Sequence, residues 1–136
     1  MRLVDPGALN RGLKFIVGIT CLVSFVLMRN QAGKACLIFH PVTIRRRNQW
    51  YRFLTSGFVH ADMLHLAINM FVLWSFGNAI EKFYFPAFMG DFSAQKYMLL
   101  YFGGIMAASV PSYFRHNKDP GYAALGASGG VSAVVF

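Results

Sequence analysis

Apolar residues along the chain gather in long runs, and short polar stretches separate these runs. A helix that crosses a bilayer needs roughly 17 to 25 mostly apolar residues. Three runs reach or approach that length, and a fourth stops with the chain at Phe136 after about half of it. We therefore predict membrane-spanning helices over residues 13–29, 62–80, 97–114 and 126–136, the last of them incomplete.

The stretch between the first two predicted helices, residues 30–58, has a different character. It holds three consecutive arginines, Arg45 to Arg47, beside a semi-apolar stretch, Ala35–Ile44. Such a mixture is typical of a segment at the boundary between lipid and water. We predict an interfacial loop that contains one short amphipathic piece.

The first apolar run has a second interpretation. Its core, Phe15–Met28, follows Arg2, Arg11 and Lys14, and a basic start before an apolar middle is also typical of a cleaved signal peptide. No clean small-x-small cleavage site follows Met28. The interpretation that we favour is a tilted span in which Lys14 extends its ammonium group to the interface.

The composition supports the assignment of the chain to a membrane. Of 136 residues, 56% are hydrophobic and 13% are charged, whereas a soluble domain carries about 25% charged residues. A chain this short cannot enclose so much apolar surface in one core. The net charge is +8, and the basic residues lie between apolar runs. We therefore expect the lipid bilayer, and not nucleic acid, as the partner of these charges.

Two polar residues inside the second apolar run are candidates for chemistry. His65 and Asn69 are four residues apart, so on a helix they project from one face. Polar groups at membrane depth are costly unless they find partners, and they usually face the bundle interior or a wet cavity. Together they suit the stabilisation of a developing oxyanion. Ordinary packing of a hydrogen-bonded histidine and a helix-tethering asparagine is the alternative.

A second candidate opens the fourth run, which begins Gly126-Ala127-Ser128-Gly129-Gly130. A serine in the first turn of a helix sits among unpaired backbone N–H groups at the positive end of the helix dipole. Attack by its hydroxyl would place the new negative charge beside those donors. Gly126 and Gly130 are also small residues four apart, which lets helices approach closely, so helix packing is the alternative here.

Taken together, and in this order along the chain, these motifs resemble the rhomboid family of intramembrane serine proteases. That family has an arginine-containing segment and a histidine before an H-x-x-x-N on its second helix, an acidic residue at the end of that helix, and a G-x-S-G on its fourth helix. The resemblance runs from about residue 13 to the last residue. The matching residues are Trp50–His60 with Arg52, His65-x-x-x-Asn69, Glu81, and Gly126-x-Ser128-Gly129.

The resemblance implies an all-α fold, a polytopic transmembrane helical bundle of rhomboid type. Residues 1–136 would form one such domain, incomplete because about four of six expected helices are present. The protein would be a multi-pass membrane protein, in the plasma or inner membrane if bacterial, with its active site on the extracytoplasmic side. The positive-inside rule favours the reverse orientation, because most of the 13 Lys and Arg fall on the outer side of that topology.

The implied activity is that of a serine endopeptidase that cleaves transmembrane-helix substrates with a Ser-His dyad. Ser128 would be the nucleophile, and its N–H with the side chains of His65 and Asn69 would form the oxyanion hole. No cofactor or metal is implied, and the oligomeric state stays open. The other residues carried over have supporting roles: His60, Arg52, Glu81, Gly126 and Gly129.

Two features depart from the family pattern. The base of the rhomboid dyad is a histidine on the sixth helix, and none of His40, His60, His65 and His116 matches that position. A serine hydroxyl is a poor nucleophile without a base, so the printed chain alone is predicted to be inactive. A basic role for His116 has no support in the family. Ser132 stands where many rhomboids have a Tyr or Phe that packs on the base.

Two other functions fit parts of the sequence. A non-catalytic rhomboid-like protein that binds or escorts transmembrane helices would share the fold, but it has no need of the set Ser128, His65 and Asn69. A haem or metal site on His60 and His65 would need both rings on one side. Their spacing on a helix places them about 140° apart, which is poor for one ion unless His60 lies in the loop before the helix.

Overall fold

The computed structural model describes residues 11–80 and 93–135. Every regular element in these ranges is a helix, apart from one isolated antiparallel bridge between Phe39 and Ala124. The predicted all-α class is therefore confirmed for the described residues. In chain order the elements are α1 (Arg11–Met28), α2 (Gln31–Leu37), α3 (Pro41–Arg47), α4 (Arg52–Thr55), the 3₁₀ helix η1 (Ser56–Phe58), α5 (Met63–Ala79), α7 (Ser93–His116) and α8 (Ser128–Val135).

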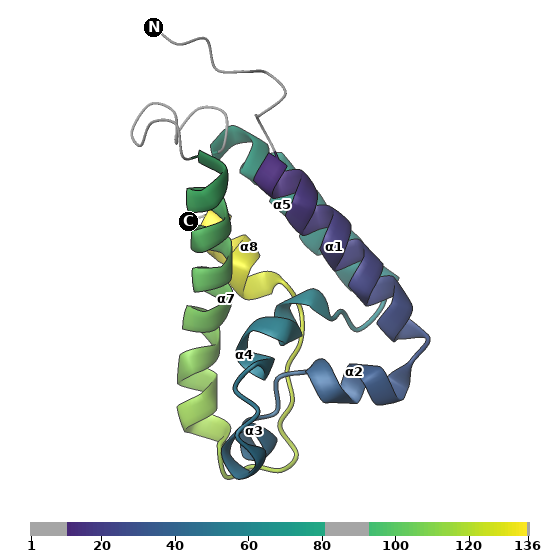
Figure 1. Ribbon diagram of the computed structural model, residues 1–136, viewed down its shortest axis with the longest axis vertical. Helices are drawn as coiled ribbons and strands as arrows, with labels where there is room; N and C mark the ends of the chain where they lie inside the picture. The colour runs from purple at the N-terminus through teal and green to yellow at the C-terminus, as the bar shows by residue number, and fades with distance from the viewer. Residues whose placement is uncertain (1–10, 81–92, 136) are drawn as a thin grey trace, which may run out of the picture.

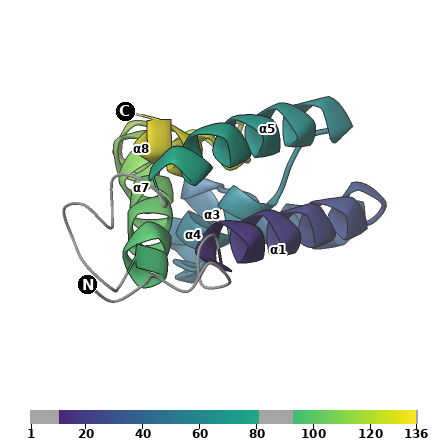
Figure 2. The same ribbon diagram turned by 90° about the horizontal axis from the view of Figure 1, so that it is seen from above.

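The long helices form a frame around the short helix α8. Helices α1 and α5 pack side by side, and α7 stands at an angle to them (Figure 1). Figure 2 shows α8 at the junction between α7 and α5. The short helices α3 and α4 gather near the end of α7, where this helix finishes at His116.

Two apolar clusters hold these elements together. The larger cluster joins α1, α5, α7 and α8, so it unites segments from both ends of the described chain. The smaller cluster lies in the connector between α1 and α5 and packs against Tyr113 of α7. The buried members of the larger cluster are Leu13, Ile16, Leu66, Met70, Leu73, Tyr97, Tyr101, Ile105, Ala127, Val131 and Val134, and those of the smaller are Phe39, Ile44 and Phe53.

Large apolar side chains also point outward from the long helices. Leu64 and Phe71 of α5 are 70% and 72% exposed, and Leu99 of α7 is 75% exposed. Among the described helices, α1 alone is long and apolar enough to cross a membrane by itself. The pair Arg52–Phe58 and Met63–Ala79, bent by 96°, adds a second candidate if it is counted as one span. Outward apolar faces of this kind fit lipid.

Local sequence explains where the helices begin. Asp62 caps α5, because its Oδ1 accepts the backbone N–H of His65 at 2.8 Å. Helix α8 begins at Ser128, two residues later than predicted, because Gly126 has a φ of 112° that a right-handed helix does not contain. The connector holds more helix than the single amphipathic piece predicted, because His40 caps a separate helix, α3.

Candidate functional site

The chain that leads into Ser128 is held at three successive points. Ala124 exchanges two backbone hydrogen bonds of 2.9 Å with Phe39. Gly126 donates its N–H to the carbonyl oxygen of Ser56 at 3.0 Å, and Ala127 donates its N–H to Nε2 of His60 at 3.2 Å. The connector between α1 and α5 therefore positions the first residue of α8.

His60 is buried, with 1% of its surface exposed, and both of its ring nitrogens have partners. Oγ of Ser24 lies 2.8 Å from Nδ1 of His60 and donates its single hydrogen to the carbonyl oxygen of Phe58 at 2.7 Å. Nδ1 must then carry the hydrogen of the other bond, while Nε2 accepts from Ala127. The hydrogen bonds thus select the neutral Nδ1–H tautomer of His60.

Electrostatics favours the same neutral form. Burial, together with the smaller effect of the neighbouring His65, lowers the pKa of His60 from its ordinary 6.5 to about 4. The two ring centroids are 5.1 Å apart in an edge-to-face arrangement. His60 is therefore uncharged at neutral pH, and its Nε2 lone pair is already used.

His65 lies directly against the backbone that precedes the serine. A Cβ placed on Gly126 would meet Cε1 of the His65 ring at 2.8 Å and Nε2 at 3.1 Å. The left-handed φ of Gly126 is a second reason why a side chain does not fit there. The polar face of α5 is thus brought within two residues of Ser128.

Asn69 lies one turn further along α5 and is buried, with 8% of its surface exposed. Its Nδ2 donates a hydrogen to the carbonyl oxygen of His65 at 2.8 Å. An amide nitrogen carries two hydrogens, so one remains for another acceptor. Asn69 therefore braces the turn that holds His65 and keeps one donor.

The first turn of α8 is pressed against α7 through glycines. A Cβ on Gly129 would lie 2.8 Å from Cβ of Ala108 and 3.1 Å from the carbonyl oxygen of Gly104. A Cβ on Gly130 would lie 2.6 Å from the ring of Tyr101. The predicted pairing of Gly126 with Gly130 as helix-packing residues is wrong in its first member, because Gly126 lies before the helix and contacts His65.

Ser128 is exposed and opens onto a cavity of about 200 Å³. Four further residues that line it carry a hydroxyl: Ser56, Ser109, Ser112 and Tyr122. A water molecule occupies roughly 30 Å³, so the cavity has room for several. Water therefore has a polar approach to the serine.

Arg52 fixes the connector through its hydrogen bonds. Its Nη1 donates to the carbonyl oxygens of Ala35 and Ile38, both at 2.8 Å, and its Nε donates to Oε1 of Gln49 at 2.8 Å. Only 5% of its surface is exposed. Glu81, the other supporting residue predicted in this role, lies outside the described residues.

The remaining histidines have partners of their own. Nδ1 of His40 accepts the backbone N–H of Thr43 at 3.2 Å. His116 lies 3.5 Å from a carboxylate oxygen of Asp119 and stacks on the ring of Tyr122 at 3.7 Å. The alternative metal site on His60 and His65 also fails as arranged, because neither nitrogen of His60 is free to bind an ion.

Ser24 and Ser56 were not among the residues predicted to matter. Ser24 reaches the site from α1, and Ser56 holds Gly126 through its carbonyl oxygen. The sequence offers one signal for Ser24, since it is a polar residue in an apolar run and lies four residues after Thr20. No side-chain pattern marks Ser56, because it holds Gly126 through its backbone.

Comparison with known proteins shows which proteins the chain is similar to. The chain is 31% identical to the Rhomboid protease GluP of Bacillus subtilis (strain 168) over 85 residues, 62% of this chain and 14% of that protein. It is 26% identical to the mitochondrial Presenilin-associated rhomboid-like protein A of Danio rerio over 131 residues, 93% of this chain and 32% of that protein. It is 46% identical to the chloroplastic Rhomboid-like protein 11 of Arabidopsis thaliana over 33 residues, 24% of this chain and 12% of that protein.

The chain therefore spans about a third or less of the length of these curated relatives. A family match gives the more general result. Residues 47–136, which include Arg52, His60, His65, Asn69 and Ser128, match the family described as Rhomboid domain. Because this match covers more than half of the sequence, the chain belongs to the rhomboid family, which is embedded in membranes and includes intramembrane serine proteases.

Proposed function

We propose that this chain carries the nucleophile and the oxyanion-binding side of an intramembrane serine endopeptidase. Ser128 is the nucleophile, and its backbone N–H with the side chains of His65 and Asn69 stabilises the oxyanion. The observation that supports this most directly is the contact between Gly126 and the ring of His65. It brings the polar face of α5 beside the first turn of α8.

In the proposed reaction, Oγ of Ser128 attacks the carbonyl carbon of the scissile peptide bond. A bond forms between Oγ and carbon, the hydroxyl proton passes to a base, and the carbonyl electron pair moves onto oxygen. The oxyanion then lies beside the N-terminal amides of α8, which have no partner within the helix. Collapse of the intermediate expels the amine, which takes the proton from the base.

The base in this proposal is a histidine outside these 136 residues, as the family's dyad implies. His60 uses both nitrogens in hydrogen bonds, and His65 stands on the oxyanion side. His40 and His116 are engaged with Thr43, Asp119 and Tyr122. The 136-residue chain by itself is accordingly expected to lack hydrolytic activity.

The proposed substrates are transmembrane helices, and the proposed membrane spans are those built on α1, α5 and α7, with α8 as the start of a fourth. Outward apolar side chains such as Leu64, Phe71 and Leu99 support this placement. On the topology that the family implies, the cavity at Ser128 faces the extracytoplasmic side. The supporting residues in the proposal are His60, Arg52, Glu81, Gly126 and Gly129.

A fluorophosphonate probe tests the nucleophile. The chain is expressed with whatever reading frame follows the codon for Phe136 and purified in detergent. We expect the probe to label it at Ser128 and expect Ser128→Ala to abolish the labelling. Ser132→Ala is the matched control, because Ser132 is exposed one helical turn away and should leave labelling unchanged.

Labelling that survives in Ser128→Ala would refute the assignment of the nucleophile. Absence of labelling in an extended chain that contains a later membrane helix with a histidine would favour the non-catalytic alternative, a protein that binds or escorts transmembrane helices.

A further inference from the structure

A second cavity lies at the connector end of the molecule, away from the residues that line the cavity at Ser128. Its volume is about 470 Å³, within the range of roughly 300 to 1,000 Å³ of small-molecule sites. One wall comes from α3 and the other from the turn that follows α7. The lining residues are Val42, Arg45, Arg46, Asn117, Lys118 and Pro120.

The charge of this cavity is positive and uncompensated. Arg45, Arg46 and Lys118 bring three cations to it, and none of them has an ion-pair partner among the described residues. The C-terminal dipole of α3 offers about half a negative charge, which is much less than the positive charge present. The positive charge of the lining therefore suits an anionic ligand.

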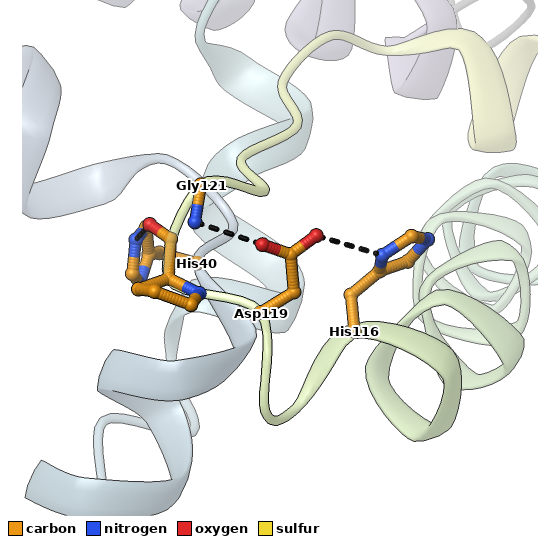
Figure 3. A network of polar contacts seen from close by, with 5 residues as sticks. His40, His116, Asp119 and Gly121 are labelled. Atoms are coloured by element: carbon orange, nitrogen blue, oxygen red, sulfur yellow. Dashed lines mark hydrogen bonds and ion pairs between the residues drawn. The ribbon is translucent and has the colours of Figure 1, made fainter.

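The acidic residue next to Lys118 is directed elsewhere. One carboxylate oxygen of Asp119 accepts the backbone N–H of Gly121 at 3.0 Å, and the other lies 3.5 Å from Nδ1 of His116 (Figure 3). These two contacts engage both carboxylate oxygens, and Asp119 is not among the residues that line the cavity. Asp119 thus leaves the positive charge of the cavity in place.

The two walls are tied together before any ligand arrives. His40 caps α3 with Nδ1, which accepts from Thr43, and its Nε2–H donates to the carbonyl oxygen of Pro120 at 3.2 Å. Figure 3 shows His40 beside the turn that holds Asp119 and Gly121. A site whose walls are already joined loses less conformational freedom on binding.

Aromatic residues place this end of the molecule at a lipid headgroup level. Trp50 is 52% exposed and stacks on Phe53, and its ring lies 5.5 Å from that of Tyr113 near the end of α7. Tyr51 is 47% exposed. Half-exposed Trp and Tyr are typical of the boundary between hydrocarbon and headgroups, where phosphate is the abundant anion.

We propose that the cavity binds the phosphate group of an anionic membrane lipid. The guanidinium forks of Arg45 and Arg46 match the oxygen geometry of a phosphate, and Lys118 adds a point charge. Asn117 supplies an amide that can donate to a headgroup oxygen. The proposal does not depend on peptidase activity, and it separates these arginines from Arg47, which does not line the cavity.

The test uses the purified chain in a neutral detergent with three probes: short-chain phosphatidylglycerol, short-chain phosphatidylcholine and inorganic phosphate. Binding is followed by native mass spectrometry and by the thermal unfolding midpoint. Arg45→Gln, Arg46→Gln and Lys118→Gln are combined in one variant. The matched control removes the same charge outside the cavity, by Arg29→Gln, Arg47→Gln and Arg115→Gln.

We expect the cavity variant to lose about a hundredfold in apparent affinity for phosphatidylglycerol, roughly fivefold per cation. The control variant should lose far less, and phosphatidylcholine should not distinguish the variants. Equal losses in both variants would overturn the proposal, since general surface charge would then explain binding. Inorganic phosphate that stabilises the chain as well as the lipid does would also overturn it in favour of a free anion. Unchanged midpoints without lipid establish that both variants are folded.

Discussion

Ala127 donates its backbone N–H to Nε2 of His60 at 3.2 Å, so the residue before the proposed nucleophile is held by a buried imidazole. That imidazole is held in turn by Ser24 on α1. One line of hydrogen bonds therefore joins the first helix, the connector and the start of α8. His60 acts on Ser128 through the backbone, as a positioning residue.

The first prediction concerns the stability of the fold at low pH. In the unfolded chain His60 has its ordinary pKa of 6.5, while burial and the neighbouring His65 lower the pKa of His60 to about 4 in the folded chain. The unfolded chain therefore binds more protons in this window, and the free energy of unfolding falls as pH falls from 6.5 to about 4. We expect a loss of about 3 kcal/mol from this group, measured by unfolding in detergent across the window. His65 is the titratable group whose ring faces His60.

Two variants separate His60 from the other titrating groups. His60→Gln should be less stable at neutral pH and should lack this part of the pH dependence. His116→Gln, outside the network, should keep it. A pH dependence that is the same in His60→Gln and the unaltered chain would contradict the assignment.

The second prediction concerns the hydroxyl that selects the tautomer. Ser24→Ala leaves the Nδ1–H of His60 buried without an acceptor, so we expect a loss of about 1–3 kcal/mol in the free energy of unfolding. Ser75→Ala, at an exposed position on α5, should change stability by less than about 0.5 kcal/mol. Nitrogen chemical shifts of His60 should show hydrogen on Nδ1 in the unaltered chain. Hydrogen on Nε2 would be inconsistent with the network.

The third prediction concerns Gly126. Gly126→Ala must accommodate a methyl group 2.8 Å from the His65 ring and a φ of 112°. We expect it to cost about 1–3 kcal/mol and to reduce fluorophosphonate labelling of Ser128. Gly103→Ala is the control, because nothing lies within 4 Å of that added Cβ. If both variants behave alike, close contact at Gly126 does not order the site.

The fourth prediction concerns Arg52. Arg52→Ala leaves two carbonyl oxygens in the connector without their hydrogen-bond donor, those of Ala35 and Ile38. We expect thermal unfolding to reveal a loss of about 3 kcal/mol, since hydrogen bonds to charged groups contribute about 1.5–3 kcal/mol. Arg47→Ala, at an exposed arginine, should be nearly neutral. A comparable loss for both would mean that charge alone, and not these bonds, stabilises the connector.

Local patterns in the sequence were enough for part of this picture. The spacing of His65 and Asn69 placed both on α5, and the apolar runs marked the long helices, because helical periodicity is written in neighbouring residues. The partners of His60 lie 36 and 67 residues away, at Ser24 and Ala127. No periodic signal connects positions so distant, so these contacts required the fold.

The connector illustrates a second limit. Its short helices α2, α3 and α4 are stabilised by Arg52 and by packing of Phe39 and Phe53, not by strong local periodicity. The start of α8 is a third case. The positive φ of Gly126 delays the helix to Ser128, and glycine alone does not disclose which sign φ takes.

Where Gly104 of α7 meets Gly129 of α8, the two main chains pack closely, and the nearest side chains are the methyl groups of Ala108 and Ala133. Glycine and alanine have no side-chain rotamers to rearrange at this contact, so we expect α7 and α8 to move as one rigid unit. The hydroxyl of Ser128 then keeps its position relative to α7 when the other helices of the bundle move. If the cavity at Ser128 widens to admit the proposed substrate, elements other than α7 and α8 must move.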